Sequence, residues 1–196
     1  MLEKLRPKID PISNKIGAKI AKFNISPTAI SVMALVFALI SGLYYSKIIF
    51  GDVILGFDSH IIAGIFLLLS GICDLLDGAV ARATKTASRK GSFIDSTLDR
   101  IAEIFIFSGI ILGQYAEPII VLLSLAASIT VSYTRAKAES LQVELKGIGM
   151  GERSERLLIL IILSFASLIR EAMIIIIIIS FITIIQRFKS ATDRLN

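Results

Sequence analysis

The chain has 196 residues, of which 55% are hydrophobic, and its mean hydropathy is +0.79. Soluble domains contain about 45–50% apolar residues, so this composition excludes an ordinary soluble enzyme and predicts an integral membrane protein. The formal net charge of +5 does not by itself indicate nucleic acid, and no nucleic-acid partner is predicted, because in a membrane protein the positions of the charges matter more than their sum.

Residues 1–24 are too polar to cross a bilayer and are predicted to form a juxtamembrane arm. A helix is expected to begin with Asp10 as its N-cap and Pro11 in its first turn. One apolar face follows at helical spacing: Ile12, Ile16, Ile20 and Phe23. With lysines on its other faces, this is typical of an amphipathic helix that lies on an anionic membrane surface. The alternative is that the helix packs on the protein itself.

Six apolar segments follow, each near the roughly 20 residues that a helix needs to cross a bilayer. They lie at 28–48, 59–83, 93–113, 117–140, 153–169 and 171–188. The predicted fold is therefore an all-α integral membrane protein, in which an N-terminal amphipathic interfacial helix precedes six transmembrane helices over residues 28–188. Short links predict antiparallel neighbours, and residues 1–196 are predicted to form a single membrane domain.

The lysines and arginines predict how the bundle is oriented. Of the 21 in the chain, only Lys47 and Arg170 lie at the ends joined by the loops after the first and fifth spans. The others lie in the arm, the regions 82–100 and 135–156, and the C-terminal tail. Because basic residues concentrate on the cytoplasmic side, a multi-pass protein of the cell membrane is predicted, with both termini in the cytoplasm.

Four aspartates lie where the second span ends and the third begins: Asp74, Asp77, Asp95 and Asp99. Each pair has a spacing of three or four, so its two side chains project from one helix face. An aspartate near the centre of a span costs about 2.5–3.5 kcal/mol on insertion scales, so these four need a compensating partner. Structural ion pairs, a cation-transport site and a divalent metal site are the alternatives. Carboxylates suit Mg²⁺ or Mn²⁺, and four can hold two ions, an arrangement used for displacement at phosphorus.

Eight fixed positions in this region form one pattern: Asp74-x-x-Asp77-Gly78-x-x-Ala81-Arg82, then Gly91-x-x-x-Asp95-x-x-x-Asp99. In these residues and spacings the chain resembles the CDP-alcohol phosphotransferases, and the six-span layout extends the resemblance over nearly the whole chain. The resemblance implies a homodimeric membrane enzyme. In such an enzyme an alcohol attacks the β-phosphorus of a CDP-linked lipid and CMP is released.

The resemblance also implies roles for individual residues. The four aspartates would bind two Mg²⁺ or Mn²⁺ ions, and Asp99 would in addition accept the proton of the incoming hydroxyl. The CDP-linked lipid would contact the signature and two nearby segments: Gly78, Ala81, Arg82, Ser88, Gly91, Thr28 and Ser31. An interfacial arginine is the alternative for Arg82, and a helix cap is the alternative for Thr28 and Ser31.

Polar residues outside the signature predict the acceptor alcohol. Several arginines lie at the cytoplasmic ends of the last three spans, and guanidinium groups match phosphate oxygens, which favours an anionic acceptor. These stretches resemble the phosphatidylinositol-phosphate synthases. The resemblance implies myo-inositol 1-phosphate as acceptor and four phosphate-binding residues: Ser132, Arg135, Arg156 and Arg187. Arg153 is predicted to be only an interfacial anchor.

The match to these synthases is incomplete, since a lysine and a proline are common where this chain has Arg135 and Ser154. The charge at Arg135 is kept, whereas the shape of the loop at Ser154 is altered. Glycerol 3-phosphate or serine would be the acceptor in the alternatives within the family. A divalent-cation transporter is the alternative outside it. The sequence leaves open whether the lipid carries diacylglycerol or archaeol.

Overall fold

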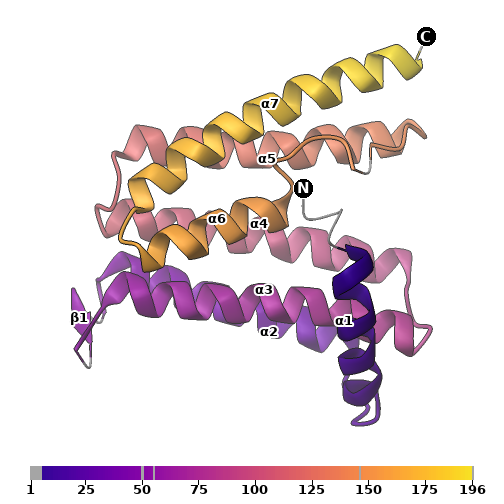
Figure 1. Cartoon of the computed structure of the whole chain (residues 1–196), viewed down its shortest axis with the longest axis horizontal. Helices are drawn as coiled ribbons and strands as arrows, with labels where there is room; N and C mark the ends of the chain where they lie inside the picture. The colour runs from indigo at the N-terminus through magenta and orange to yellow at the C-terminus, as the bar shows by residue number, and fades with distance from the viewer. Residues whose placement is uncertain (1–5, 50, 55, 146, 196) are drawn as a thin grey trace.

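The computed structural model describes residues 6–49, 51–54, 56–145 and 147–195. Residues 1–5 of the predicted arm lie outside this part of the chain. The described residues form seven helices and one small pair of strands (Figure 1). In chain order these are α1 (Arg6–Ala21), α2 (Pro27–Ser46), β1 (Val53–Ile54), β2 (Phe57–Asp58), α3 (Ser59–Ala83), α4 (Arg89–Leu112), α5 (Pro118–Ser140), α6 (Arg153–Phe165) and α7 (Ile169–Leu195).

The six predicted apolar segments correspond to helices α2 to α7, which run along the long axis of the molecule (Figure 1). Four of them, α2, α3, α5 and α7, are long and apolar enough to cross a membrane. The α4 helix has comparable length but carries several charged residues, and α6 has only 13 residues. Many exposed side chains of these helices are Ile, Leu, Val or Phe, as lipid contact requires. The chain is thus a multi-pass membrane protein.

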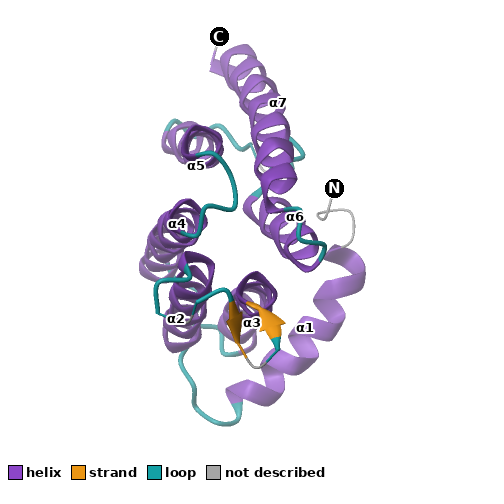
Figure 2. Cartoon of the chain, turned by 90° about the vertical axis from the view of Figure 1, so that its left-hand side faces the viewer, coloured by secondary structure: helices purple, strands orange, loops and turns teal. Residues whose placement is uncertain are grey.

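The N-terminal helix α1 runs across α3 rather than along it (Figures 1 and 2). It begins at Arg6, so the prediction that Asp10 caps it is wrong, and Pro11 lies inside the helix. Small residues make the contact with α3: a Cβ added to Gly17 would lie only 2.8 Å from the backbone carbonyl carbon of Ala79. Phe23, on the predicted apolar face, is 77% exposed. The contact with the bundle is therefore made by small residues together with Ile20, which packs against the core of α2 and α3, while Ile12, Ile16 and Phe23 of the predicted apolar face stay exposed.

Close helix contacts hold α2, α3 and α4 together. A Cβ on Gly109 of α4 would overlap the carbonyl oxygen of Gly42 on α2, so the two backbones touch at this crossing. The Ser41 hydroxyl of α2 donates to the carbonyl of Ala63 on α3 at 2.8 Å. Small residues and hydroxyls are the usual means by which helices associate in a membrane. This three-helix unit fixes where α3 ends and where α4 begins.

Helices α5, α6 and α7 form the other side of the bundle, and α6 also contacts α3 (Figure 2). The strands β1 and β2 pair antiparallel, Val53 with Asp58, in the loop between α2 and α3. Sequence analysis did not predict this hairpin. It lies at the end of the bundle opposite to α1 and to the α3–α4 link (Figure 1).

Candidate active site

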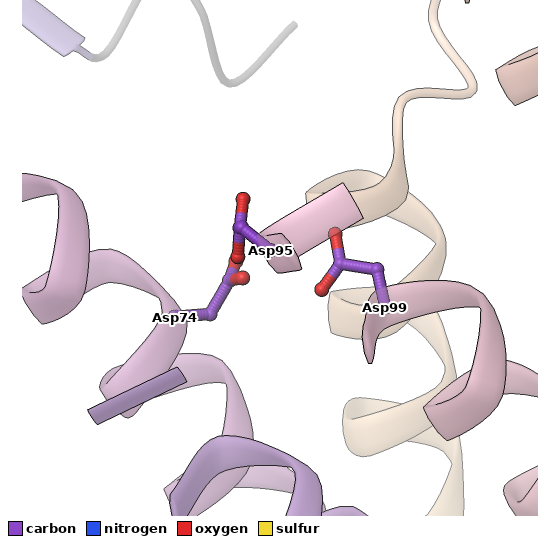
Figure 3. A group of neighbouring side chains, drawn as sticks. All are labelled: Asp74, Asp95 and Asp99. Carbon is purple, nitrogen blue, oxygen red and sulfur yellow. The ribbon is translucent and has the colours of Figure 1, made fainter. Parts of the chain in front are cut away.

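Three of the four signature aspartates converge between α3 and α4. Asp74 projects from α3, and Asp95 and Asp99 project from α4 (Figure 3). One carboxylate oxygen from each lies within 4.8 Å of the others. Three carboxylates this close together repel one another, and a nearby cation relieves the repulsion. Three converging oxygen donors form a set that suits Mg²⁺ or Mn²⁺.

The fourth aspartate, Asp77, is directed toward α2. Its Oδ2 accepts a hydrogen bond of 2.6 Å from the hydroxyl of Ser31, and the residue is only 7% exposed. The side chain of Asp77 also neighbours that of Asp95. Asp77 therefore lies beside the three-carboxylate group, and Ser31 fixes its orientation.

The predicted lipid contacts on α3 lie one turn further along the helix. Gly78 and Ala81 are half-buried, and a Cβ on Gly78 would meet only the guanidinium of Arg82, at 3.4 Å. The Nε of Arg82 donates to Oδ1 of Asn14 on α1 at 3.1 Å. Arg82 is exposed, and the space beside Gly78 is bordered by a flexible side chain that can move for a ligand.

Serine side chains cap the start of α4, which carries Asp95 and Asp99, and the start of α2, which packs against α3. Ser88 Oγ accepts from the Gly91 backbone N–H at 3.1 Å and caps α4. Ser26 Oγ accepts from the Ala29 N–H at 3.2 Å and caps α2. The capping alternative for Thr28 is therefore wrong, because Ser26 takes that role, and Thr28 is exposed in the first turn of α2.

Arg153 lies inside the aspartate group. Its Nη1 is 2.8 Å from Oδ1 of Asp74 and 2.9 Å from Oδ1 of Asp99, and its side chain is 14% exposed. The prediction that Arg153 is only an interfacial anchor is wrong. One cationic nitrogen bridging two carboxylates marks the place where these oxygens would hold a metal ion. The geometry and the donor set therefore fit a divalent cation.

A buried ion pair continues the charged cluster one turn deeper into the bundle. Glu103 Oε1 lies 2.6 Å from Arg156 Nη2, and Arg156 Nη1 donates to the Gly151 carbonyl at 2.5 Å. Glu103 and Arg156 are 6% and 3% exposed. Sequence analysis missed Glu103, although it continues the spacing of four residues set by Asp95 and Asp99.

Arg187 and Arg135 surround a second carboxylate. Arg187 is 2% exposed, and its Nη1 and Nε donate to the carbonyls of Val131 and Ile148 at 2.7 and 2.9 Å. Its Nη2 lies 3.4 Å from Oε1 of Glu152, and Arg135 Nη1 lies 3.9 Å from the same oxygen. The guanidinium of Arg187 thus ties α7 to α5 and to the loop that precedes α6.

Ser132, the remaining predicted acceptor residue, accepts a hydrogen bond from Nη1 of Arg100. Arg100 also pairs with Asp99, at 3.6 Å, and with Glu103, at 3.4 Å. The structure thus brings the four predicted acceptor residues to the same end of α5, α6 and α7. Each of them already contacts groups of the protein itself.

The sequence model that describes CDP-alcohol phosphatidyltransferases matches residues 24–186 of this chain. The chain belongs to this family. The matched range contains all four signature aspartates. This CDP-alcohol phosphatidyltransferase is therefore a membrane-bound transferase of phospholipid biosynthesis. A cation transporter, the alternative outside the family, is set aside by the same match.

Similar proteins cover almost the full length of this CDP-alcohol phosphatidyltransferase. Archaetidylinositol phosphate synthase of Pyrococcus horikoshii is 34% identical over 195 residues, which cover 100% of this chain and 98% of that one. Two structures of Mycobacterium tuberculosis phosphatidylinositol phosphate synthase share the fold at 22% identity. The one with CDP-DAG bound has a TM-score of 0.74 and coverage of 92% and 94%; the one with manganese and citrate has 0.75, with 91% and 88%.

Proposed function

We propose that this enzyme transfers the phosphatidyl-type group of a CDP-linked lipid to myo-inositol 1-phosphate and releases CMP. The observation that carries the proposal is the placement of the Asp74, Asp95 and Asp99 carboxylates next to an arginine-rich end of α5, α6 and α7. The carboxylates can hold cations for a pyrophosphate, and the arginines can attract an acceptor that carries a phosphate. The names of the similar proteins support the same acceptor.

The four signature aspartates would hold two Mg²⁺ or Mn²⁺ ions, which when bound neutralise the pyrophosphate and stabilise the leaving CMP. Asp99 would accept the proton of the acceptor hydroxyl. The hydroxyl oxygen forms a bond to the β-phosphorus, and the bond from this phosphorus to the bridging oxygen of CMP breaks. Gly78 and Arg82 would border the nucleotide. Ser132 and the arginines at 135, 156 and 187 would bind the acceptor phosphate.

We further infer the setting of this reaction in the membrane. All six helices from α2 to α7 would span the bilayer, with the charged residues of α4 and α6 shielded inside the bundle. The termini and the aspartates would face the cytoplasm. The α1 helix would lie in the interface, since it crosses the bundle and exposes Ile12 and Ile16. A homodimer is expected from the family, and the lipid would be CDP-diacylglycerol or CDP-archaeol.

An acceptor panel tests the proposal. Purified protein receives a CDP-linked lipid and, separately, myo-inositol 1-phosphate, inositol, glycerol 3-phosphate or serine, and release of radiolabelled CMP is measured. We expect release with inositol 1-phosphate and none from Asp95→Asn, a variant that loses one charged ligand while it keeps its shape. A preference for glycerol 3-phosphate would reassign the acceptor. A preference for an uncharged alcohol would discard the phosphate pocket.

A further inference from the structure

Two consecutive residues, Glu152 and Arg153, place opposite charges into the two halves of the site. They lie at the start of α6, Glu152 as the residue that caps the helix and Arg153 as its first residue. Arg153 reaches the aspartates, and Glu152 reaches the arginines of α5 and α7. One dipeptide therefore contacts both the group that should bind cations and the group that should bind an anion.

In the half of the site that holds the aspartates, called the anionic half below, Arg153 lies where a cation would bind. Its Nη1 lies 2.8 and 2.9 Å from single oxygens of Asp74 and Asp99. A divalent ion bound through these two Oδ1 atoms would compete with the guanidinium for them, and the like charges of ion and guanidinium would repel each other at this distance. Metal binding at this position therefore favours movement of Arg153 away from the aspartates.

In the other half of the site, called the cationic half because it holds Arg135 and Arg187, Glu152 lies where an anion would bind. Its Oε1 faces Arg187 Nη2 at 3.4 Å and Arg135 Nη1 at 3.9 Å. A phosphate oxygen is recognised by guanidinium groups in the same way as a carboxylate oxygen. Arg187 is only 2% exposed, so a phosphate can reach its guanidinium only if neighbouring side chains move.

We propose that Glu152 and Arg153 form an internal counter-ion pair, which the metal ions and the acceptor phosphate displace when they bind. The inference rests on the proposed function and adds to it a mechanism of substrate entry. Because the two residues are neighbours at one helix end, a metal ion that displaces Arg153 also frees Glu152 from the arginines. Metal and phosphate should therefore favour each other's binding.

Metal affinity tests the anionic half. Binding of Mn²⁺ to the purified full chain is followed by electron paramagnetic resonance, without CDP-linked lipid or acceptor. Arg153→Gln removes the competing cation, so it should bind Mn²⁺ about fivefold more tightly or better, the lower end of typical coupling between sites. Arg153→Lys keeps the charge and should remain near wild type. Unchanged or weaker binding by Arg153→Gln would overturn the proposal, because a residue that merely supports the aspartates gives that result.

A matched control separates exchange from a general loss of positive charge. Arg170 also forms an ion pair, with Glu117 at 2.8 Å, but it lies at the start of α7, far along the chain from the aspartates. Arg170→Gln should leave the Mn²⁺ affinity unchanged. If Arg170→Gln tightened Mn²⁺ binding as much as Arg153→Gln does, the effect would be one of net charge and the exchange would be refuted.

Phosphate affinity tests the cationic half, and its measurements on the wild type and on Glu152→Gln do not depend on whether Arg153→Gln folds. Radiolabelled inorganic phosphate is titrated with and without Mn²⁺. In the wild type, Mn²⁺ should tighten phosphate binding about fivefold or more. Glu152→Gln should bind phosphate more tightly without Mn²⁺, and the double variant of both residues should lose the dependence on Mn²⁺. A dependence that persists in the double variant would show direct contact between metal and phosphate and would reject the coupling.

These measurements can fail separately from the proposed function. Neither uses a CDP-linked lipid, inositol or turnover, so a different acceptor in the panel leaves the exchange test intact. Conversely, synthesis of the expected product with unchanged Mn²⁺ affinity in Arg153→Gln would uphold the function and reject the exchange.

Discussion

Three acidic residues at a spacing of four, Asp95, Asp99 and Glu103, follow one face of α4 and have different partners. Asp95 and Asp99 face Asp74 of α3 in the proposed cation site. Glu103 is one turn deeper and pairs with the buried Arg156 of α6. A carboxylate that is paired and buried stabilises its partner arginine, whereas carboxylates that converge on one another need an exchangeable cation. Acidic residues on one helix face thus serve structure at one turn and, in the function proposed above, chemistry at the turns before it.

We predict that Glu103→Gln destabilises the fold. The substitution leaves the Arg156 guanidinium buried without its counter-charge, and breaking a buried ion pair costs about 3–5 kcal/mol. For a chain of this size, the Tm in detergent should fall by roughly 10 °C. Thermal unfolding followed by circular dichroism measures this change.

The control for this experiment is Glu117→Gln, which removes a carboxylate from the exposed pair with Arg170. Solvent screens that pair, so the Tm should scarcely change. Equal losses of Tm in both variants would show that burial of the Glu103–Arg156 pair has no special importance for stability.

The aspartates were predictable from sequence, because their spacing and their place at span ends are local properties. The environment of Arg153 was not. An arginine at the start of a span has the same local pattern whether it anchors the helix at the interface or bridges Asp74 and Asp99. Only the packing of α6 beside α3 and α4 decides between them. Glu103 was missed for the same reason, since Arg156 lies far away in the chain.

At the scale of helices and strands, hydropathy predicted the order of α2 to α7 and all their ends to within four residues except the end of α7, since apolar runs bounded by charges mark these ends. The start of α1 was wrong because Pro7 occupies its early turn, so that Pro11 falls inside the helix. The α7 helix continues to Leu195, beyond the predicted end at 188, because its polar last turns remain helical outside the apolar run. The hairpin of β1 and β2 is too short to produce a periodic pattern.

We predict that Gly109→Ala weakens the contact between α2 and α4. The new Cβ would overlap the Gly42 carbonyl oxygen, and overpacking of this kind costs about 1–3 kcal/mol. Alanine favours a helix over glycine by about 1 kcal/mol, so we expect a net loss of stability of up to about 2 kcal/mol. Chemical unfolding in mixed micelles gives the value.

Ser108→Ala provides the comparison, because Ser108 precedes Gly109 on the same helix but is exposed. It should unfold like the wild type. If Gly109→Ala proved as stable as Ser108→Ala, α2 and α4 would not be in backbone contact.

At the scale of the whole molecule, the charged site and the hairpin lie at opposite ends of the bundle (Figure 1). The aspartates, α1 and the α3–α4 link share one end. The distribution of lysines and arginines predicted this polarity from sequence. The position of each helix in the bundle was not predictable in this way, since antiparallel order does not say which helices touch.

We predict that the link between α3 and α4 faces the cytoplasm and that the hairpin faces outside. The reporters are Thr86→Cys and Val53→Cys, each at an exposed position, in a background where the buried Cys73 is replaced by serine. A membrane-impermeant maleimide added to intact cells should label only the protein with Val53→Cys, and lysis should expose both. Labelling of the Thr86→Cys protein in intact cells would invert the orientation.

The charges of α4 also bear on how the chain enters the membrane during synthesis. The α4 helix holds Asp95, Asp99, Arg100 and Glu103 in its first and middle turns, and each charge near a helix centre costs about 2.5–3.5 kcal/mol on insertion scales. Besides Arg100 of α4 itself, Asp99 and Glu103 pair with Arg153 and Arg156 of α6, which the ribosome makes only after α5. In the six-span topology proposed above, α4 therefore cannot settle in lipid when it emerges, and its integration is completed by a later segment. Substitution of an α6 arginine would lower the yield of inserted protein as well as its turnover.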